Sequence, residues 1–283
     1  MEGSSTTEPE SPVSSEKEAP AEAHVPIVDV PPPSSVRPDD TLRAFKQKPL
    51  ATTWSWIHDY FAGGDVSLGI AAVPLCFLSM ALYTRSPFTN FIFDEQEALL
   101  ANPYVRSVAD PHPKFRWIDA IHRDFWGLPP DRSIGSYRPI PDVIWRFLWW
   151  IGARDQTPFL DHWVNVLLHG LNGALVAIIV QRTTRDRTTA WLAGSIFVAS
   201  AVVTEAVSGV VGIADVLGAL GVLAALCALA LPIRLMPLGV LAATLYGLFS
   251  KESALCAVPL VPFCALLTAR LVHREKPQAW LRA

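Results

Sequence analysis

Long apolar runs constrain this chain more than any other feature of its sequence. The run SLGIAAVPLCFLSMALY, Ser67 to Tyr83, is the first. The later runs cover Phe159–Val180, Thr188–Val203, Val210–Leu231, Ile233–Phe249 and Ala254–Leu271. A helix needs about 20 apolar residues to cross a bilayer, and only helices and closed barrels satisfy their backbone groups in lipid. The sequence therefore predicts an all-α polytopic membrane protein with about six transmembrane helices.

The composition supports a membrane protein and excludes two other classes. Of the 283 residues, 51% are hydrophobic and only 17% are charged, which is too apolar for an ordinary soluble domain. The net charge of -3 leaves no basic face for nucleic acid. The four cysteines, Cys76, Cys227, Cys256 and Cys264, lie inside apolar runs and show no metal or disulfide spacing, so we expect no metal and no cofactor.

The chain divides into a polar tail and an apolar domain. Residues 1–50 are rich in Glu, Ser and Pro and poor in large apolar residues, which predicts a disordered tail rather than a signal peptide. Residues 51–283 form the predicted multi-span membrane domain. Within it, residues 84–158 are polar and aromatic and form a large loop.

Basic residues at the ends of the runs predict the orientation. They precede the first run and separate the second from the third and the fourth from the fifth, and more of them follow the sixth. Because basic loops stay in the cytoplasm, both termini are expected there. The 84–158 loop and the turns 204–209 and 250–253 are then exoplasmic. The bacterial inner membrane is the predicted location, with the endoplasmic reticulum as the alternative.

Two aromatic segments of the loop have helical spacing. FRWIDAIHRDFWG and PDVIWRFLWWIG are both expected to form amphipathic helices that lie in the membrane interface. Their tryptophans either anchor neighbouring spans or also cover a site.

Ionisable residues gather at the exoplasmic ends of the runs. They are Asp94, Glu95, Arg138, Glu205, Asp215, Lys251 and Glu252, with Tyr137 beside them. Such groups cost free energy unless they face water, a cavity or a partner, so each is a candidate site residue. Simpler alternatives exist, because Arg138 could pair with Asp142, and Lys251 and Glu252 could cap a turn. His162 and His169 lie two helical turns apart, which favours polar contacts in the core over metal binding.

The order of several motifs resembles a known family. FIFDEQEALLANPYV, DFWG, SYRPI, DHWVNVLLHGLNGALV, TEAVSGVVGIADVLGAL and FSKESAL are similar to the membrane region of transmembrane O-mannosyltransferases that carry tetratricopeptide repeats. These enzymes belong to the C-type glycosyltransferase superfamily. The resemblance implies transfer of a sugar such as mannose from a polyprenyl-phosphate carrier to a protein hydroxyl on the exoplasmic side. The implied partners are the bilayer, the lipid-linked sugar and a protein acceptor.

The resemblance also implies roles for the polar residues. Asp94 stands where the family places its catalytic carboxylate, and a base there would take the proton of the attacking hydroxyl. Glu95 is expected to assist it. Arg138 and Lys251 are expected to bind the leaving phosphate, because cationic donors stabilise its charge. The residues expected to shape the site are Tyr137, His162, Glu205, Asp215 and Glu252.

Two other functions stay open. Ser200, Ala201, Val203 and Ile213 stand where the family usually has two histidines, a proline and an arginine, and the chain ends soon after the sixth run. A truncated or degenerate homologue that binds a lipid carrier or a membrane partner without catalysis is therefore the main alternative. A transporter is a weaker one, since no inverted repeat is visible.

Overall fold

A computed structural model describes residues 66–91, 94–108, 115–152 and 157–275, with only the backbone for 268–275. These residues all belong to one compact unit, Thr53–Ala283. Every regular element within the described ranges is helical, so the prediction of an all-α fold is confirmed. The tail predicted to be disordered, residues 1–50, lies outside the described residues.

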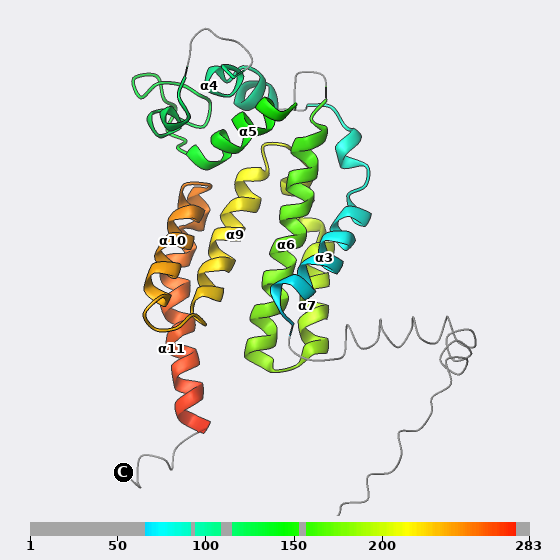
Figure 1. The fold of residues 1–283 in the computed structure, drawn as a ribbon, viewed down its shortest axis with the longest axis vertical. Coiled ribbons are helices and arrows are strands. Elements are labelled where there is room, and N and C mark those ends of the chain that lie inside the picture. The colour runs from blue at the N-terminus through cyan, green and yellow to red at the C-terminus, as the bar shows by residue number, and fades with distance from the viewer. Residues whose placement is uncertain (1–65, 92–93, 109–114, 153–156, 276–283) are drawn as a thin grey trace, which may run out of the picture. The chain divides into compact units, whose positions relative to one another are not determined.

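The longest helix, α6 (Phe159–Thr184), organises the packing of the others. It contacts three apolar helices, and Figure 1 shows them around it: α3 (Leu68–Leu82), α7 (Arg187–Ala199) and α9 (Ile213–Ala228). Two further helices pack on α9: α10 (Met236–Leu248) and α11 (Ala257–Glu275). Five of the six apolar runs predicted from the sequence therefore lie within a few residues of one helix each. The remaining run, Thr188–Val203, forms α7 followed by a short turn.

Glycines allow some of these helices to approach closely. A Cβ atom on Gly170 of α6 would lie 2.5 Å from the Cα of Cys76 in α3. A Cβ on Gly221 of α9 would lie 2.4 Å from the Cα of Gly247 in α10. No larger residue fits at either position without moving a backbone, so these glycines set the distance between the paired helices.

The lengths of the helices do not confirm the predicted number of spans. Among the described residues, only α6 is long and apolar enough to cross a membrane by itself. A second span results if Arg187–Ala199 and Ala201–Ser208, which are bent by 43°, count as one broken helix. The remaining apolar helices are shorter, because turns occupy the ends of the apolar runs. A helix of 13 residues, such as α10, is about 20 Å long, against about 30 Å of hydrocarbon.

Short elements build the segment between α3 and α6 and the turns after α7 and α10. They are η1 (Ser86–Phe88), the π-helical turn η2 (Gln96–Leu100), α4 (Pro103–Arg106), η3 (Trp117–His122), η4 (Ala201–Val203), α8 (Thr204–Ser208) and η5 (Glu252–Cys256). The long amphipathic helix among them is α5 (Pro139–Ile151), as the second aromatic segment predicted.

The prediction of a helix over the whole first aromatic segment is wrong. Only Trp117–His122 is helical, as a short 3-10 turn. The chain then folds around Asp124, whose carboxylate accepts hydrogen bonds from the backbone N–H groups of Trp126, Leu128 and Ile134. A side chain that satisfies backbone donors in this way favours a turn over a helix.

Arg146 fastens α5 to the rest of the loop. The residue is 5% exposed, and its guanidinium donates three hydrogen bonds of 2.6 Å. The acceptors are the carbonyls of Tyr104 and Phe115 and the hydroxyl of Ser107. Because charge-assisted hydrogen bonds are strong when buried, this contact positions α5 and with it Arg138, the residue that precedes its first turn.

Candidate functional site

The two acidic residues at positions 94 and 95 face different environments. Asp94 is exposed, and its carboxylate makes no hydrogen bond or ion pair with the described residues. Glu95 is 2% exposed, and its Oε1 accepts a hydrogen bond of 2.6 Å from the backbone N–H of Val210. Glu95 therefore joins the start of the loop to the turn before α9, and Asp94 is left facing solvent.

The first turns of α6 hold a buried group of polar side chains. His162 is fully buried and hydrogen-bonds with the hydroxyls of Ser86, at 3.3 Å, and Thr89, at 3.2 Å. Asn165 donates to the carbonyl of Gly209 at 2.7 Å. These contacts bind α6 to η1 and to the turn after α8, so the predicted residue His162 lies beside the segments that Glu95 joins.

Sequence reasoning did not single out Asp161 or Asn165, which belong to the same group. Both oxygens of Asp161 are buried and have no hydrogen-bond partner among the described residues, and Glu95 acts on it electrostatically. The spacing of Asp161 and Asn165, four residues apart on one helical face, was the signal that could have found them. The carboxyl groups of Glu95 and Asp161 are thus both buried and close enough to interact.

The two cations predicted to bind phosphate are both ion-paired. Lys251 Nζ lies 3.0 Å from Asp215 Oδ2, and Arg138 Nη2 lies 2.8 Å from Glu252 Oε2. The guanidinium of Arg138 also stacks over the ring of Phe125, at 4.7 Å from its centroid. The possible pairing of Arg138 with Asp142 is thereby replaced by a pair with Glu252.

Arg138 changes the pKa of its partner Glu252. Partial burial raises the pKa of Glu252, but the hydrogen bonds and positive charge of Arg138 outweigh this effect, and the net pKa is lowered. Glu252 is therefore ionised at neutral pH. Since Lys251 and Glu252 are adjacent, the start of η5 is tied both to α9 and to the start of α5.

The other two predicted residues, Tyr137 and Glu205, take no part in these ion pairs. The Tyr137 hydroxyl donates to the carbonyl of Ile121 at 3.1 Å, and its ring packs edge-on against Phe249. Tyr137 thus fastens the loop to the end of α10. Glu205 is exposed on α8, and its carboxylate makes no hydrogen bond or ion pair within the described part of the chain.

A core of large side chains lies between the Glu95 contact and the two ion pairs. Phe125, Trp145 and Tyr104 from the loop pack there with Val210 and Ile213. Glu95 is bonded to Val210, Arg138 stacks on Phe125, and Asp215 follows Ile213 by two residues. Glu95 and Arg138 are therefore both anchored to residues of this core.

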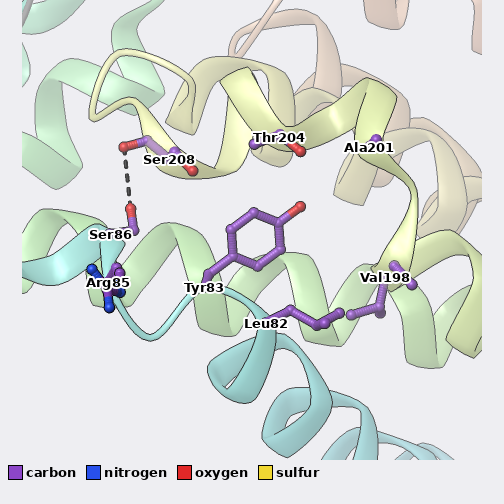
Figure 2. A pocket seen from close by; sticks show the side chains of 9 residues that line it. Leu82, Tyr83, Arg85, Ser86, Val198, Ala201, Thr204 and Ser208 are labelled. Atoms are coloured by element: carbon purple, nitrogen blue, oxygen red, sulfur yellow. Dashed lines mark hydrogen bonds between the residues drawn. The ribbon is translucent and has the colours of Figure 1, made fainter.

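A separate pocket of about 330 Å³ lies between the end of α3 and the segment from α7 to α8. Figure 2 shows its lining residues, which are Leu82, Tyr83, Arg85, Ser86, Val198, Ala199, Ala201, Thr204 and Ser208. The hydroxyl of Ser86 donates to the carbonyl of Ser208 at 3.2 Å and closes one side. The lining combines hydroxyl groups and one arginine with an apolar wall.

The chemistry available at this end of the helices is that of carboxylates and cations. No group of three His, Cys, Asp or Glu side chains in the described ranges could hold a metal ion. Asp94 has the exposure that a base needs to reach a proton on a substrate. Arg138 and Lys251 have the positive charge to contact a phosphate, but each cation would then interact with the phosphate and with its carboxylate partner at the same time.

About half of the chain is similar to animal protein O-mannosyl-transferases. It is 34% identical over 139 residues to Protein O-mannosyl-transferase Tmtc2 of Drosophila melanogaster, covering 48% of this chain and 14% of that protein. It is 36% identical over 152 residues to TMTC1 of Mus musculus, covering 53% and 15%, and 31% identical over 153 residues to TMTC3 of the same species, covering 52% and 15%. The resemblance to O-mannosyltransferases expected from the motifs is confirmed.

The similarity covers only part of these relatives, since the chain aligns with 14–15% of their length. No family model matches the chain. No solved structure matches it significantly.

Proposed function

We propose that this chain is a membrane glycosyltransferase-like protein that transfers a sugar such as mannose from a polyprenyl-phosphate carrier to a hydroxyl of a protein. The observation that carries the proposal is the similarity of about half of the chain to proteins named O-mannosyl-transferases. The relatives are proteins of animals, which have no bacterial inner membrane, and this favours the endoplasmic reticulum of the two predicted locations.

A bilayer is the environment that best suits the exposed apolar side chains. Phe77 of α3, Ile196 of α7, Leu238 of α10 and Leu266 of α11 are between 64% and 68% exposed. Large apolar side chains in such positions on several helices are costly in water and favourable in lipid. We place about six spans in the membrane, with the 84–158 loop on the exoplasmic side and both termini in the cytoplasm.

In the proposed reaction, Asp94 takes the proton of the acceptor hydroxyl as its oxygen attacks the anomeric carbon of the sugar. The bond from that carbon to the carrier phosphate breaks, and the phosphate leaves with the electron pair. Asp94 has the exposure for this role, and Glu95 holds its segment against Val210. Arg138 and Lys251 contact the leaving phosphate, which requires Glu252 and Asp215 to share their partners.

A second candidate function is a non-catalytic protein that binds a lipid carrier or a membrane partner. The two ion pairs favour it, because the charges of Arg138 and Lys251 are each compensated by a carboxylate of the chain itself. A transferase assay with the purified full chain in nanodiscs separates the two candidates. Its substrates are polyprenyl-phosphate mannose and an acceptor peptide rich in Ser and Thr.

We expect Asp94→Asn to lower turnover by roughly 100-fold or more and to leave the affinity for the donor nearly unchanged, because a base acts only in the transition state. Asp131→Asn, at an exposed carboxylate of the same loop, is the matched control and should keep full turnover. Undiminished activity of Asp94→Asn would refute the assignment of the base. Donor binding without turnover in the wild type would favour the non-catalytic protein.

A further inference from the structure

We propose that the pocket between α3 and α8 binds the phosphate of an anionic lipid, with Arg85 as its charged contact. This inference rests on the proposed membrane location but not on transferase activity. It adds a site that is separate from Arg138 and Lys251, which line no part of this pocket.

Arg85 is the feature that points to an anion. Its side chain is exposed at the pocket and makes no hydrogen bond or ion pair with any residue that the structure describes. Arg138 and Lys251, by contrast, lie 2.8 and 3.0 Å from carboxylate oxygens. An arginine without a carboxylate partner presents its full charge and a planar set of donors that match a phosphate.

Three hydroxyl groups add neutral donors to the same space. They belong to Tyr83, Thr204 and Ser208, and none of them bonds to another side chain or carbonyl in the described ranges. Figure 2 shows the ring of Tyr83 extending from the end of α3 toward the helix that carries Thr204 and Ser208. A phosphate has several acceptor oxygens, so hydroxyl donors that line the same pocket as a guanidinium give it a lining of suitable chemistry.

Apolar surface next to these donors favours a lipid over a free phosphate ion. Leu82 and Val198 line the pocket, and Leu82 is 52% exposed. The helices that frame the pocket expose further large side chains, Phe77 on α3 and Ile196 on α7. A hydrocarbon chain attached to the phosphate would cover such side chains. The volume of about 330 Å³ suits a head group but not a whole lipid.

Equilibrium binding of a tritiated short-chain isoprenyl phosphate to the full chain in phosphatidylcholine nanodiscs tests the proposal. Arg85→Gln should weaken binding by about tenfold or more, as expected for a lost charge-assisted contact. Thr204→Val, which keeps the shape but removes the hydroxyl, should weaken it by about threefold. Arg132→Gln, at an exposed arginine of the loop, should leave binding unchanged.

Other ligands identify the chemistry that is recognised. The corresponding isoprenol, which lacks phosphate, should bind at least tenfold more weakly than the isoprenyl phosphate. Competition by phosphatidylserine would mean that the pocket takes lipid phosphates in general, and competition by inorganic phosphate alone would overturn the role of the lipid chain.

Equal binding by wild type and Arg85→Gln, or loss of binding in Arg138→Gln only, would overturn the proposal. If Arg85→Gln does not fold, Arg85→Lys, which keeps the charge but loses the planar set of donors, and Thr204→Val should both weaken binding, and unchanged binding in both would overturn the proposal. Turnover is not measured, so the result is independent of the proposed catalysis.

Discussion

At the scale of single residues, burial separates side chains that look equivalent in the sequence. Asp94 and Glu95 are neighbouring acids, yet one faces solvent and the other is 2% exposed and bonded to a backbone N–H. Asp142 is fully buried, and its two oxygens have no hydrogen-bond partner among the described residues. These three carboxyl groups therefore differ in what they contribute to stability and to chemistry.

Removing the Glu95 contact should destabilise the fold. Glu95→Ala leaves the N–H of Val210 without its acceptor and should lower the free energy of unfolding by about 2 kcal/mol. Glu95→Gln keeps an acceptor oxygen at the same place and should cost about half as much. Thermal unfolding of the purified protein measures both changes. Glu97→Ala, at an exposed position of η2, is the control, and an equal loss in all three variants would contradict a specific contact.

Asp142 should make stability depend on pH. Burial raises the pKa of Asp142 well above its ordinary range, the negative charge of Asp124 raises it further, and Arg138 opposes them. The folded chain then holds this proton more tightly than the unfolded chain. Stability from this group is present at low pH and declines as the pH rises from about 4 toward the raised pKa of the folded state.

The variant Asp142→Asn tests this dependence, because the amide keeps the shape of the side chain and has no proton to lose. Its melting temperature relative to the wild type should increase with pH across the same window. Unfolding curves of both proteins between about pH 4 and about pH 8 provide the measurement. If the melting temperatures of the two proteins change with pH by the same amount, Asp142 does not titrate in this range.

At the scale of elements, short turns end the helices of the apolar runs, and close contacts determine how these helices pack. The turn from α10 into η5 carries Lys251 and Glu252, and their ion pairs reach α9 and the start of α5. The α9–α10 pair in turn depends on Gly221 and Gly247, whose backbones nearly touch. The position of the two ion pairs thus depends on helix packing that glycine permits.

Gly221→Ala should therefore separate α9 from α10. The added Cβ would lie 2.4 Å from the Cα of Gly247, and overpacking of this kind costs about 1 to 3 kcal/mol. Gly69→Ala in α3 is the matched control, because a Cβ there meets nothing within 4 Å and should stabilise the helix by up to about 1 kcal/mol. Melting temperatures of the two variants should move in opposite directions. A Gly221→Ala protein as stable as the wild type would disprove the close contact.

At the scale of the whole molecule, α6 is the element on which the membrane proposal depends most. It has 26 residues, contacts α3, α7 and α9, and carries the buried polar group in its first turns. If it crosses the bilayer, the loop before it and the turn after it lie on opposite sides of the membrane.

Labelling of single cysteines tests this crossing. Ser133→Cys in the loop and Thr183→Cys near the end of α6 are both at exposed positions, and the four native cysteines would first be replaced by serine. In sealed vesicles, an impermeant maleimide should label one of the two sites directly and the other only after permeabilisation. Labelling of both from the same side would contradict a membrane-spanning α6.

The helical class, the approximate position of each apolar helix and the relationship to O-mannosyltransferases could be predicted from the sequence. These properties follow from local composition, spacing and motif order. The packing of distant segments, in contrast, buries Glu95 against Val210, 115 residues away, and pairs Arg138 with Glu252, 114 residues away, rather than with nearby Asp142. The tertiary structure also decided that Asp161 belongs to the candidate site and that the first aromatic segment turns around Asp124. Such contacts depend on how distant segments pack, and no local pattern of residues encodes that packing.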